Sequence, residues 1–281
     1  GALAAANSGE HSNVVIGYIA GASIDHASSD NNVIIGVGAG TGGGAAMGNC
    51  VVIGDNAMNA TAANAQTGTI AIGSDALGAL TSGAGNVAVG YQAGDAIDTG
   101  GQNTIVGYGA GSAISGNTGN VYIGHLAGDA NTGEYNIGIG KDALGDASAD
   151  VDKSIAIGYA ALSLADSAYD DRCIAVGHGA LQNQDGTANC HNVAIGYDAG
   201  NDTTTGYQNS LLGYQAGNDL STGYHNTILG YDSQASAVGG INQTVVGADT
   251  TGVSNNSVTL GDASVTDVYM SQDSQAYVHS Q

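Results

Sequence analysis

Two glycine-rich phrases are the first places in this chain where chemistry could be carried. The phrase GAGTGG at residues 38–43 matches the G-x-G-x-x-G pattern that lets a backbone approach a dinucleotide pyrophosphate. The phrase GKD at residues 140–142 begins like a phosphate-binding loop but lacks its Ser or Thr. Because 48 of the 281 residues are glycine, chance matches are expected, and neither phrase has the strand and helix context of a nucleotide site. We therefore predict no nucleotide binding.

Histidine and aspartate are the next candidates, for catalysis and for metal binding. The seven histidines are scattered, with no Ser/His/Asp order and no His-x-x-x-His spacing, so we predict no catalytic residues and no enzyme. Acidic residues gather in segments of turn composition, where stacked carboxylates could supply oxygen ligands to calcium. Asp95, Asp129, Asp202 and Asp219 are weak calcium candidates, and a solvated edge is the favoured interpretation. No other cofactor is predicted.

The formal net charge of −22 restricts the partners of the chain. Only Lys141, Lys153 and Arg172 oppose 25 acidic residues. Nucleic-acid binding needs basic residues that replace the counterions of the phosphates, so we expect no nucleic-acid partner. An anionic membrane surface would repel the chain, and the sequence contains no run of 18 apolar residues, so no membrane insertion is expected.

A repeat organises these residues. Fifteen glycines each follow Ile, Val or Leu, and successive ones are 14 to 19 residues apart. We call these glycines the anchors and number the repeats 1 to 15 by them. The anchors are Gly17, Gly36, Gly54, Gly73, Gly90, Gly107, Gly124, Gly140, Gly158, Gly177, Gly196, Gly213, Gly230, Gly247 and Gly261.

Four columns of residues recur around the anchors. Eleven repeats carry Val or Ile three residues before the anchor, nine carry Asn four before it, and twelve carry Ala three after it. The alternation in N-x-V-A-I-G predicts a short strand, and a second extended piece is expected around the Ala column. One such unit cannot bury its apolar face alone, whereas many stacked units can. The sequence therefore predicts an all-β chain, a parallel β-solenoid (a β-roll or β-helix) of about 15 short repeats.

The residue two before each anchor is also apolar in nearly every repeat, from Val15 to Val245. We expect the residue directly before the anchor, such as Ile157, to fill the inside of the coil. The column two before the anchor is then exposed unless another chain covers it. This predicts a homotrimeric rod. The Asn column is expected to occupy turns and to form hydrogen-bonded ladders along the axis.

The positions of the tyrosines and cysteines within the repeat decide how these residues are interpreted. A stripe of tyrosines directly follows the anchors, with His125 and His178 at equivalent positions, and either chain packing or recognition of a sugar or receptor fits it. Cys173 and Cys190 are 17 residues apart, nearly one coil, so a disulfide is possible, although they stand four and six residues before their anchors and their Cα atoms need not meet the required separation. The stripe residues are Tyr91, Tyr108, Tyr159, Tyr197, Tyr214 and Tyr231.

The repeat phrases carry a family resemblance over roughly residues 13 to 281. NSVTLG at residues 256–261 and the N-x-V-A-I-G phrases resemble the head repeats of trimeric autotransporter adhesins. GYQAGNDLSTGYHNTILGYDSQ at residues 213–234 resembles repeat stretches of bacteriophage tail-fibre proteins more closely. The resemblance implies a trimeric, extended, extracellular protein on a virion tail fibre or a cell surface.

We therefore expect a structural or adhesive fibre protein, the shaft or host-attachment part of a phage tail fibre. A bacterial surface adhesin head or a self-assembling extracellular filament is the alternative. The expected partners are further copies of the chain and a cell-surface glycan or receptor. The expected domains are a lead-in over residues 1–12, the solenoid over 13–265, and terminal cap or transition strands over 266–281.

Overall fold

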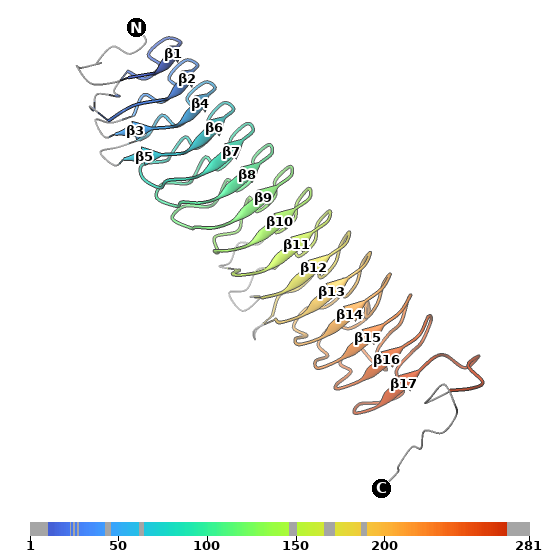
Figure 1. Cartoon of the computed structure of the whole chain (residues 1–281). Coiled ribbons are helices and arrows are strands. Elements are labelled where there is room, and N and C mark those ends of the chain that lie inside the picture. The colour runs from blue at the N-terminus through green and yellow to red at the C-terminus, as the bar shows by residue number, and fades with distance from the viewer. Residues whose placement is uncertain are drawn as a thin grey trace, which may run out of the picture.

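The computed structural model shows an all-β rod whose coils are stacked along one axis, with strands between Val14 and Leu260 (Figure 1). The part of the chain that the structure describes contains no helix, and hence none long and apolar enough to cross a membrane. The described residues are 11–22, 24, 26, 28–42, 46–61, 65–145, 151–165, 172–186 and 190–268.

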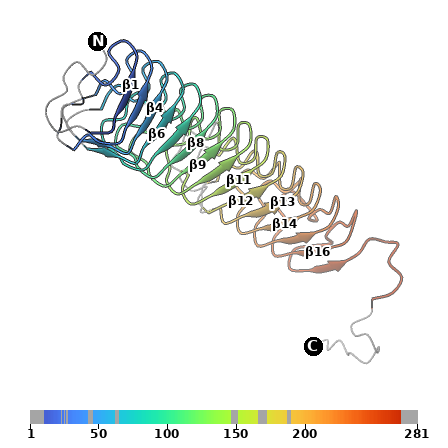
Figure 2. The ribbon, with the colours of Figure 1, turned by 45° about the horizontal axis from the view of Figure 1, so that its top comes forward.

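Fifteen strands of three residues form one parallel sheet that runs along the rod (Figure 2). Each strand pairs in register with the strands one coil before and one coil after it, and ends at the residue before its anchor. This confirms the predicted parallel β-solenoid. The strands are β1 (Val14–Ile16), β2 (Val33–Ile35), β4 (Val51–Ile53), β6 (Ile70–Ile72), β7 (Val87–Val89), β8 (Thr104–Val106), β9 (Val121–Ile123), β10 (Ile137–Ile139), β11 (Ile155–Ile157), β12 (Ile174–Val176), β13 (Val193–Ile195), β14 (Ser210–Leu212), β15 (Thr227–Leu229), β16 (Thr244–Val246) and β17 (Val258–Leu260).

Backbone geometry explains why the anchors are glycine. From Gly17 to Gly247 they adopt φ values between 135° and 148°, which L-residues rarely reach. From Gly17 to Gly230, a Cβ on any anchor would also collide with the carbonyl oxygen of the next anchor. The glycine column therefore lets successive coils approach closely at the point where each strand ends.

The segment around the Ala column differs from the predicted second strand. After each anchor the backbone forms turns, and positive φ recurs two and four residues past it, as at Gln215 and Gly217. Hydrogen bonds still link these turns from coil to coil, for example from Gly200 N to Ala216 O at 3.0 Å. A second sheet is confined to β3 (Met47–Gly48) and β5 (Gln66–Thr67) within the described residues.

The two faces of the strands are the reverse of the sequence prediction. The residue two before the anchor is fully buried, as at Ile34, Ala88 and Ala156, whereas the residues one and three before it point outward. Ile157 is 37% exposed, so the prediction that it fills the inside of the coil is wrong. The inward column accepts side chains of many sizes, with five Ala, six Val or Ile, and one each of Gly, Leu, Tyr and Thr.

One large side chain shows how the interior adapts. Tyr122 occupies the inward column of β9 and is fully buried, with its hydroxyl donating to Asn131 Oδ1 at 3.1 Å. The next coil carries Gly138 in the same column, where a Cβ would stand 2.9 Å from the Tyr122 ring. Burial raises the pKa of the Tyr122 hydroxyl. The ring therefore takes the space that a side chain would fill in the next coil.

The Asn column forms the predicted ladder, inside the rod rather than at its surface. Along the ladder, the backbone N–H of one coil donates to the Asn Oδ1 of the coil before it, as from Asn226 N to Asn209 Oδ1 at 2.9 Å. Asn209 Nδ2 in turn donates to Gly223 O at 2.9 Å. Each such amide therefore satisfies buried backbone groups on its neighbouring coil, which apolar side chains could not do.

The expected domain boundaries stay predictions. Residues 1–10 of the expected lead-in and 269–281 of the expected cap lie outside the described residues. Residues 266–268 contain no strand and are exposed. The terminal cap therefore stays a prediction.

A pair of neighbouring substitutions tests which face is inside. Ala156→Asp places an unpaired carboxylate in the interior and is expected to lower the free energy of unfolding by about 2–5 kcal/mol. Ile157→Asp places the same charge on the outer face and leaves the coil interior intact. Circular dichroism melting measures both at a concentration where light scattering shows monomers, and a larger loss for Ile157→Asp there would contradict the orientation of the strands.

Candidate functional site

An uncharged apolar face runs along the sheet of the rod. It consists of the residues one and three before each anchor, and we call it the outer face. Eleven of its fifteen positions three before the anchor are Val or Ile, the other four are Thr or Ser, and all fifteen positions one before the anchor are Ile, Val or Leu. None is charged, although the chain carries 25 acidic residues. Exposed fractions reach 68% at Val258 and 57% at Ile16, and Leu212 is 47% exposed.

The outer face is hollowed near its C-terminal end. A depression of about 210 Å³ crosses β13, β14 and β15 where Ser210 and Thr227 replace the usual Val or Ile. Its rim carries Ile195, Leu212 and Leu229, all at least 39% exposed. A depression in an apolar sheet without charged groups suits an apolar protein surface better than a polar ligand.

The predicted tyrosine stripe is a stack of rings along the rod. The rings of Tyr197, Tyr214 and Tyr231 lie parallel, with centroids 5.2 and 5.1 Å apart. His178 continues the stack between Tyr159 and Tyr197, at centroid distances of 5.0 and 4.8 Å.

The N-terminal part of the stripe follows the same pattern. Tyr91, Tyr108 and His125 stack at 5.1 and 5.3 Å. Lys141 occupies the position between His125 and Tyr159, and its Nζ lies 5.2 Å from the centre of the Tyr159 ring. The structure therefore brings all six predicted tyrosines into one column over nine coils, with the two histidines and Lys141 completing it.

Stacking determines what the stripe can offer to a ligand. The ring faces contact neighbouring rings of the same chain, so hydroxyl groups and ring edges are what solvent reaches. Sugars bind aromatic side chains mainly through the ring face, which is open only where the stack ends. The geometry thus favours packing of coil on coil, and recognition by the stripe stays a prediction.

Ring stacking is expected to contribute to stability. Tyr214→Ser removes two stacking contacts and should lower the free energy of unfolding by about 1–3 kcal/mol. Tyr18→Ser is the matched control, because Tyr18 occupies the same column, is 70% exposed and has no stacked ring among the described residues. Equal melting temperatures for the two variants would show that the stack adds nothing.

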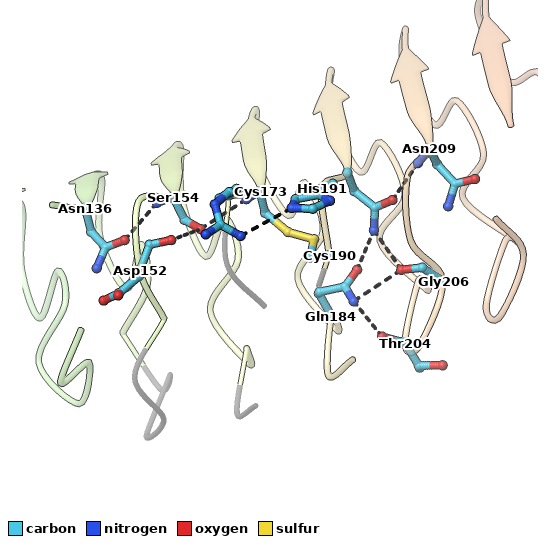
Figure 3. Close-up of a disulfide and its surroundings, with 12 residues drawn as sticks. Asn136, Asp152, Ser154, Cys173, Gln184, Cys190, His191, Thr204, Gly206 and Asn209 are labelled. Carbon is cyan, nitrogen blue, oxygen red and sulfur yellow. Dashed lines mark hydrogen bonds between the residues drawn. A yellow bond between two sulfur atoms is a disulfide. The ribbon is translucent and has the colours of Figure 1, made fainter. Parts of the chain in front are cut away.

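The structure joins Cys173 and Cys190 in a disulfide between consecutive coils (Figure 3). Their Cα atoms are 5.8 Å apart, inside the range of roughly 4.4–6.8 Å that a disulfide requires. The spacing argument that counted against the bridge therefore does not hold. Cys50, the third cysteine, is buried and unbridged, and burial raises the pKa of its thiol.

The disulfide lies where the Asn ladder is interrupted. Asn136 Oδ1 accepts from Ser154 N at 2.9 Å, and Ser154 Oγ accepts from Cys173 N at 3.1 Å (Figure 3). The ladder resumes at Asn192, whose Oδ1 accepts from Asn209 N at 2.8 Å. A covalent bond thus links the two coils at a level of the ladder that carries no Asn side chain, in addition to the backbone hydrogen bonds between them.

The bridge gives a direct chemical prediction. Trypsin cannot test it, because no Lys or Arg follows Arg172 and both cysteines stay in one peptide. Cleavage before Asp185 separates them, so non-reducing mass spectrometry should find two linked peptides and a free Cys50. Cys173→Ser should lower the free energy of unfolding by about 3 kcal/mol, as expected when a disulfide that closes a loop of this size is lost. Separate peptides in the oxidised protein would contradict the bridge.

The calcium candidates are not gathered into one site. Asp95 and Asp129 share a column two coils apart, and Asp202 and Asp219 share another in adjacent coils. Burial raises the pKa of the Asp95 carboxyl. No group of three or more metal-binding side chains occurs in the described part of the chain. Calcium binding therefore gains no support from the geometry.

The sequence analysis missed a second aromatic stack. The rings of Tyr207 and Tyr224 stack at 4.8 Å, and His225 lies edge-on to both. Both tyrosines stand six residues before their anchors, so the same alignment that revealed the first stripe contains this one.

Comparison with known proteins found no match to this chain among family models, curated proteins or solved structures.

Proposed function

We propose that this chain is a non-enzymatic fibre protein whose copies assemble into a homotrimeric rod through the outer face. It serves as the shaft or host-attachment part of a phage tail fibre, outside the cell. The continuous, uncharged outer face is the observation that carries the proposal. A surface of that length and composition is costly to leave in water.

The dimensions of the outer face suit a protein interface. Fifteen strands at about 4.8 Å spacing give a length of about 70 Å, and three extended residues give a width of about 10 Å. The resulting area of about 700 Å² per chain is near the ~800 Å² per partner of a stable complex. The area therefore supports association rather than an isolated rod.

The periodicity of the face favours further copies of the same chain as its cover. Rows of side chains repeat every coil, and only a surface with the same repeat can interdigitate along the full length. Residue sizes also compensate within a coil, since Ser210 is paired with Leu212 and Thr227 with Leu229. Parallel copies in register place the small row of one chain against the large row of the next at each level.

The location outside the cell is supported by the disulfide. Such bonds persist in oxidising environments and are rare in the cytosol. In a trimer, any weak surface contact to a glycan or receptor recurs three times and gains avidity. The resemblance of the repeats to phage tail fibres favours that origin over the alternative, a bacterial adhesin head or a self-assembling extracellular filament.

The test is the oligomeric state of the chain and of one outer-face variant. Light scattering should give a mass three times the 27.3 kDa of the chain at micromolar concentration. Ile157→Asp buries a carboxylate in each subunit interface and should shift the protein to monomers.

Gln92→Asp is the matched control for this test. It adds the same charge two residues past an anchor, where the chain itself carries Asp75 and Asp198, and it should stay trimeric. A monomeric wild-type chain, or an Ile157→Asp variant that keeps the full mass, would refute the proposal.

A further inference from the structure

The few basic residues of this acidic chain are not spread evenly over the rod. Lys153, Arg172 and His191 each stand five residues before their anchors, in three consecutive coils. That position has positive φ in all three, with values of 57°, 59° and 45°. Two of the three Lys and Arg residues of the whole chain therefore fall in one column, on adjacent coils.

Backbone hydrogen bonds fix the stacking of this column. Lys153 N donates to Glu134 O at 3.0 Å, and Arg172 N donates to Asp152 O at 3.0 Å. The column therefore advances by one coil, about 4.8 Å, per residue. Lys153 and Arg172 are exposed, and His191 is partly exposed.

The partners of these side chains leave positive charge at Arg172 rather than at Lys153. Lys153 Nζ lies 3.2 Å from Asp152 Oδ2, which neutralises it in part. Arg172 Nη1 lies 3.5 Å from His191 Nε2, an uncharged acceptor when the imidazole is neutral. Among the described residues, the salt bridges involve Lys141, Lys153 and His178 but not Arg172.

The disulfide holds the centre of this column in place. Cys173 follows Arg172 and Cys190 precedes His191, so the bridge clamps together the two coils that carry these side chains. Figure 3 shows His191 beside the bridge. A guanidinium held at a fixed position loses less entropy on binding an anion than a mobile one.

We propose that Lys153, Arg172 and His191 form an anion-binding clip for an acidic polysaccharide. The ligand class follows from the chemistry, since a guanidinium fork recognises sulfate or carboxylate groups through paired hydrogen bonds. A linear polyanion that runs along the rod meets the donor groups of Lys153, Arg172 and His191 one coil apart. The clip rests on the proposed attachment function, because it names the chemical class of the partner to which the fibre would attach.

The global charge makes this surface selective. A chain with a net charge of −22 repels polyanions at long range, but screening at 0.15 M salt limits that repulsion to about 8 Å. Binding therefore requires local contact with the clip. Nonspecific adhesion of polyanions to the rest of the rod is suppressed.

The experiment passes the oxidised full-length chain over immobilised dextran sulfate, polygalacturonate and neutral dextran at 0.15 M salt. Dextran sulfate and polygalacturonate distinguish sulfate from carboxylate ligands, and retention on either of them but not on neutral dextran is expected. Inorganic sulfate should compete. Arg172→Gln should weaken binding about tenfold, the equivalent of one charge-assisted contact.

Gln92→Asp is the matched control, because it makes the net charge more negative by one unit, as Arg172→Gln does, and lies outside the clip. It should change affinity less than twofold. Equal losses for Gln92→Asp and Arg172→Gln would indicate an effect of net charge and overturn the clip. Asp170 and Asp171 precede Arg172 outside the described residues, so binding that appears only after Asp171→Asn would also overturn it.

Oligomeric mass is measured on the same samples. Trimers that bind neither dextran sulfate nor polygalacturonate would contradict the clip but not the assembly proposal. Monomers that bind them through Arg172 contradict the assembly proposal alone.

Discussion

The close approach of consecutive anchors is the constraint on which the rest of this rod depends. From Gly17 to Gly230, each strand is followed by a glycine whose Cα lies so close to the carbonyl oxygen of the next anchor that any Cβ would collide with it. This contact holds the strands in register over fifteen coils, even though the spacing between anchors varies from 14 to 19 residues. Extra residues are accommodated in the turns, and the sheet remains regular.

Because the strands pair in register, residues at equivalent positions of successive repeats lie next to one another in a column along the rod. Aromatic residues become stacks, amides become ladders, and aliphatic residues become a continuous apolar strip. The same rule acts on rare residues, since two basic side chains five residues before consecutive anchors must lie one above the other. A repeat of this kind therefore creates surface features by alignment alone, and a single substitution interrupts or starts a column.

The fold could be predicted from the sequence because the aliphatic-glycine pair recurs in every repeat. The buried face could not, since period-two alternation gives two columns and does not say which is inside when both are apolar. Ala156 lies inside and Ile157 outside because of the way the whole coil closes, which the sequence of one strand does not reveal. The segment around the Ala column was expected to be extended, but positive φ at alternate residues makes it a series of turns.

The site was predictable to the extent that it follows the columns. The tyrosine stripe was found from its position after the anchors, and Tyr207 and Tyr224 could have been found in the same way. The distance between the Cα atoms of Cys173 and Cys190 could not be predicted from the sequence. It depends on how the backbone turns between the positions six and four before an anchor. The basic column needed both the alignment and the hydrogen bonds that fix its rise.

The disulfide also changes how the rod responds to tension. In a solenoid each coil contacts only its neighbours, so a force on the ends can peel coils away one at a time. Each coil that opens converts a rise of about 4.8 Å into roughly 55–60 Å of extended chain, a large release of length for a tether under load. Between Cys173 and Cys190 the chain cannot extend in this way, because the disulfide bears the force and the segment between the two cysteines, which are 17 residues apart, carries none of it. The rod thus combines extensible coils with one inextensible segment near its middle.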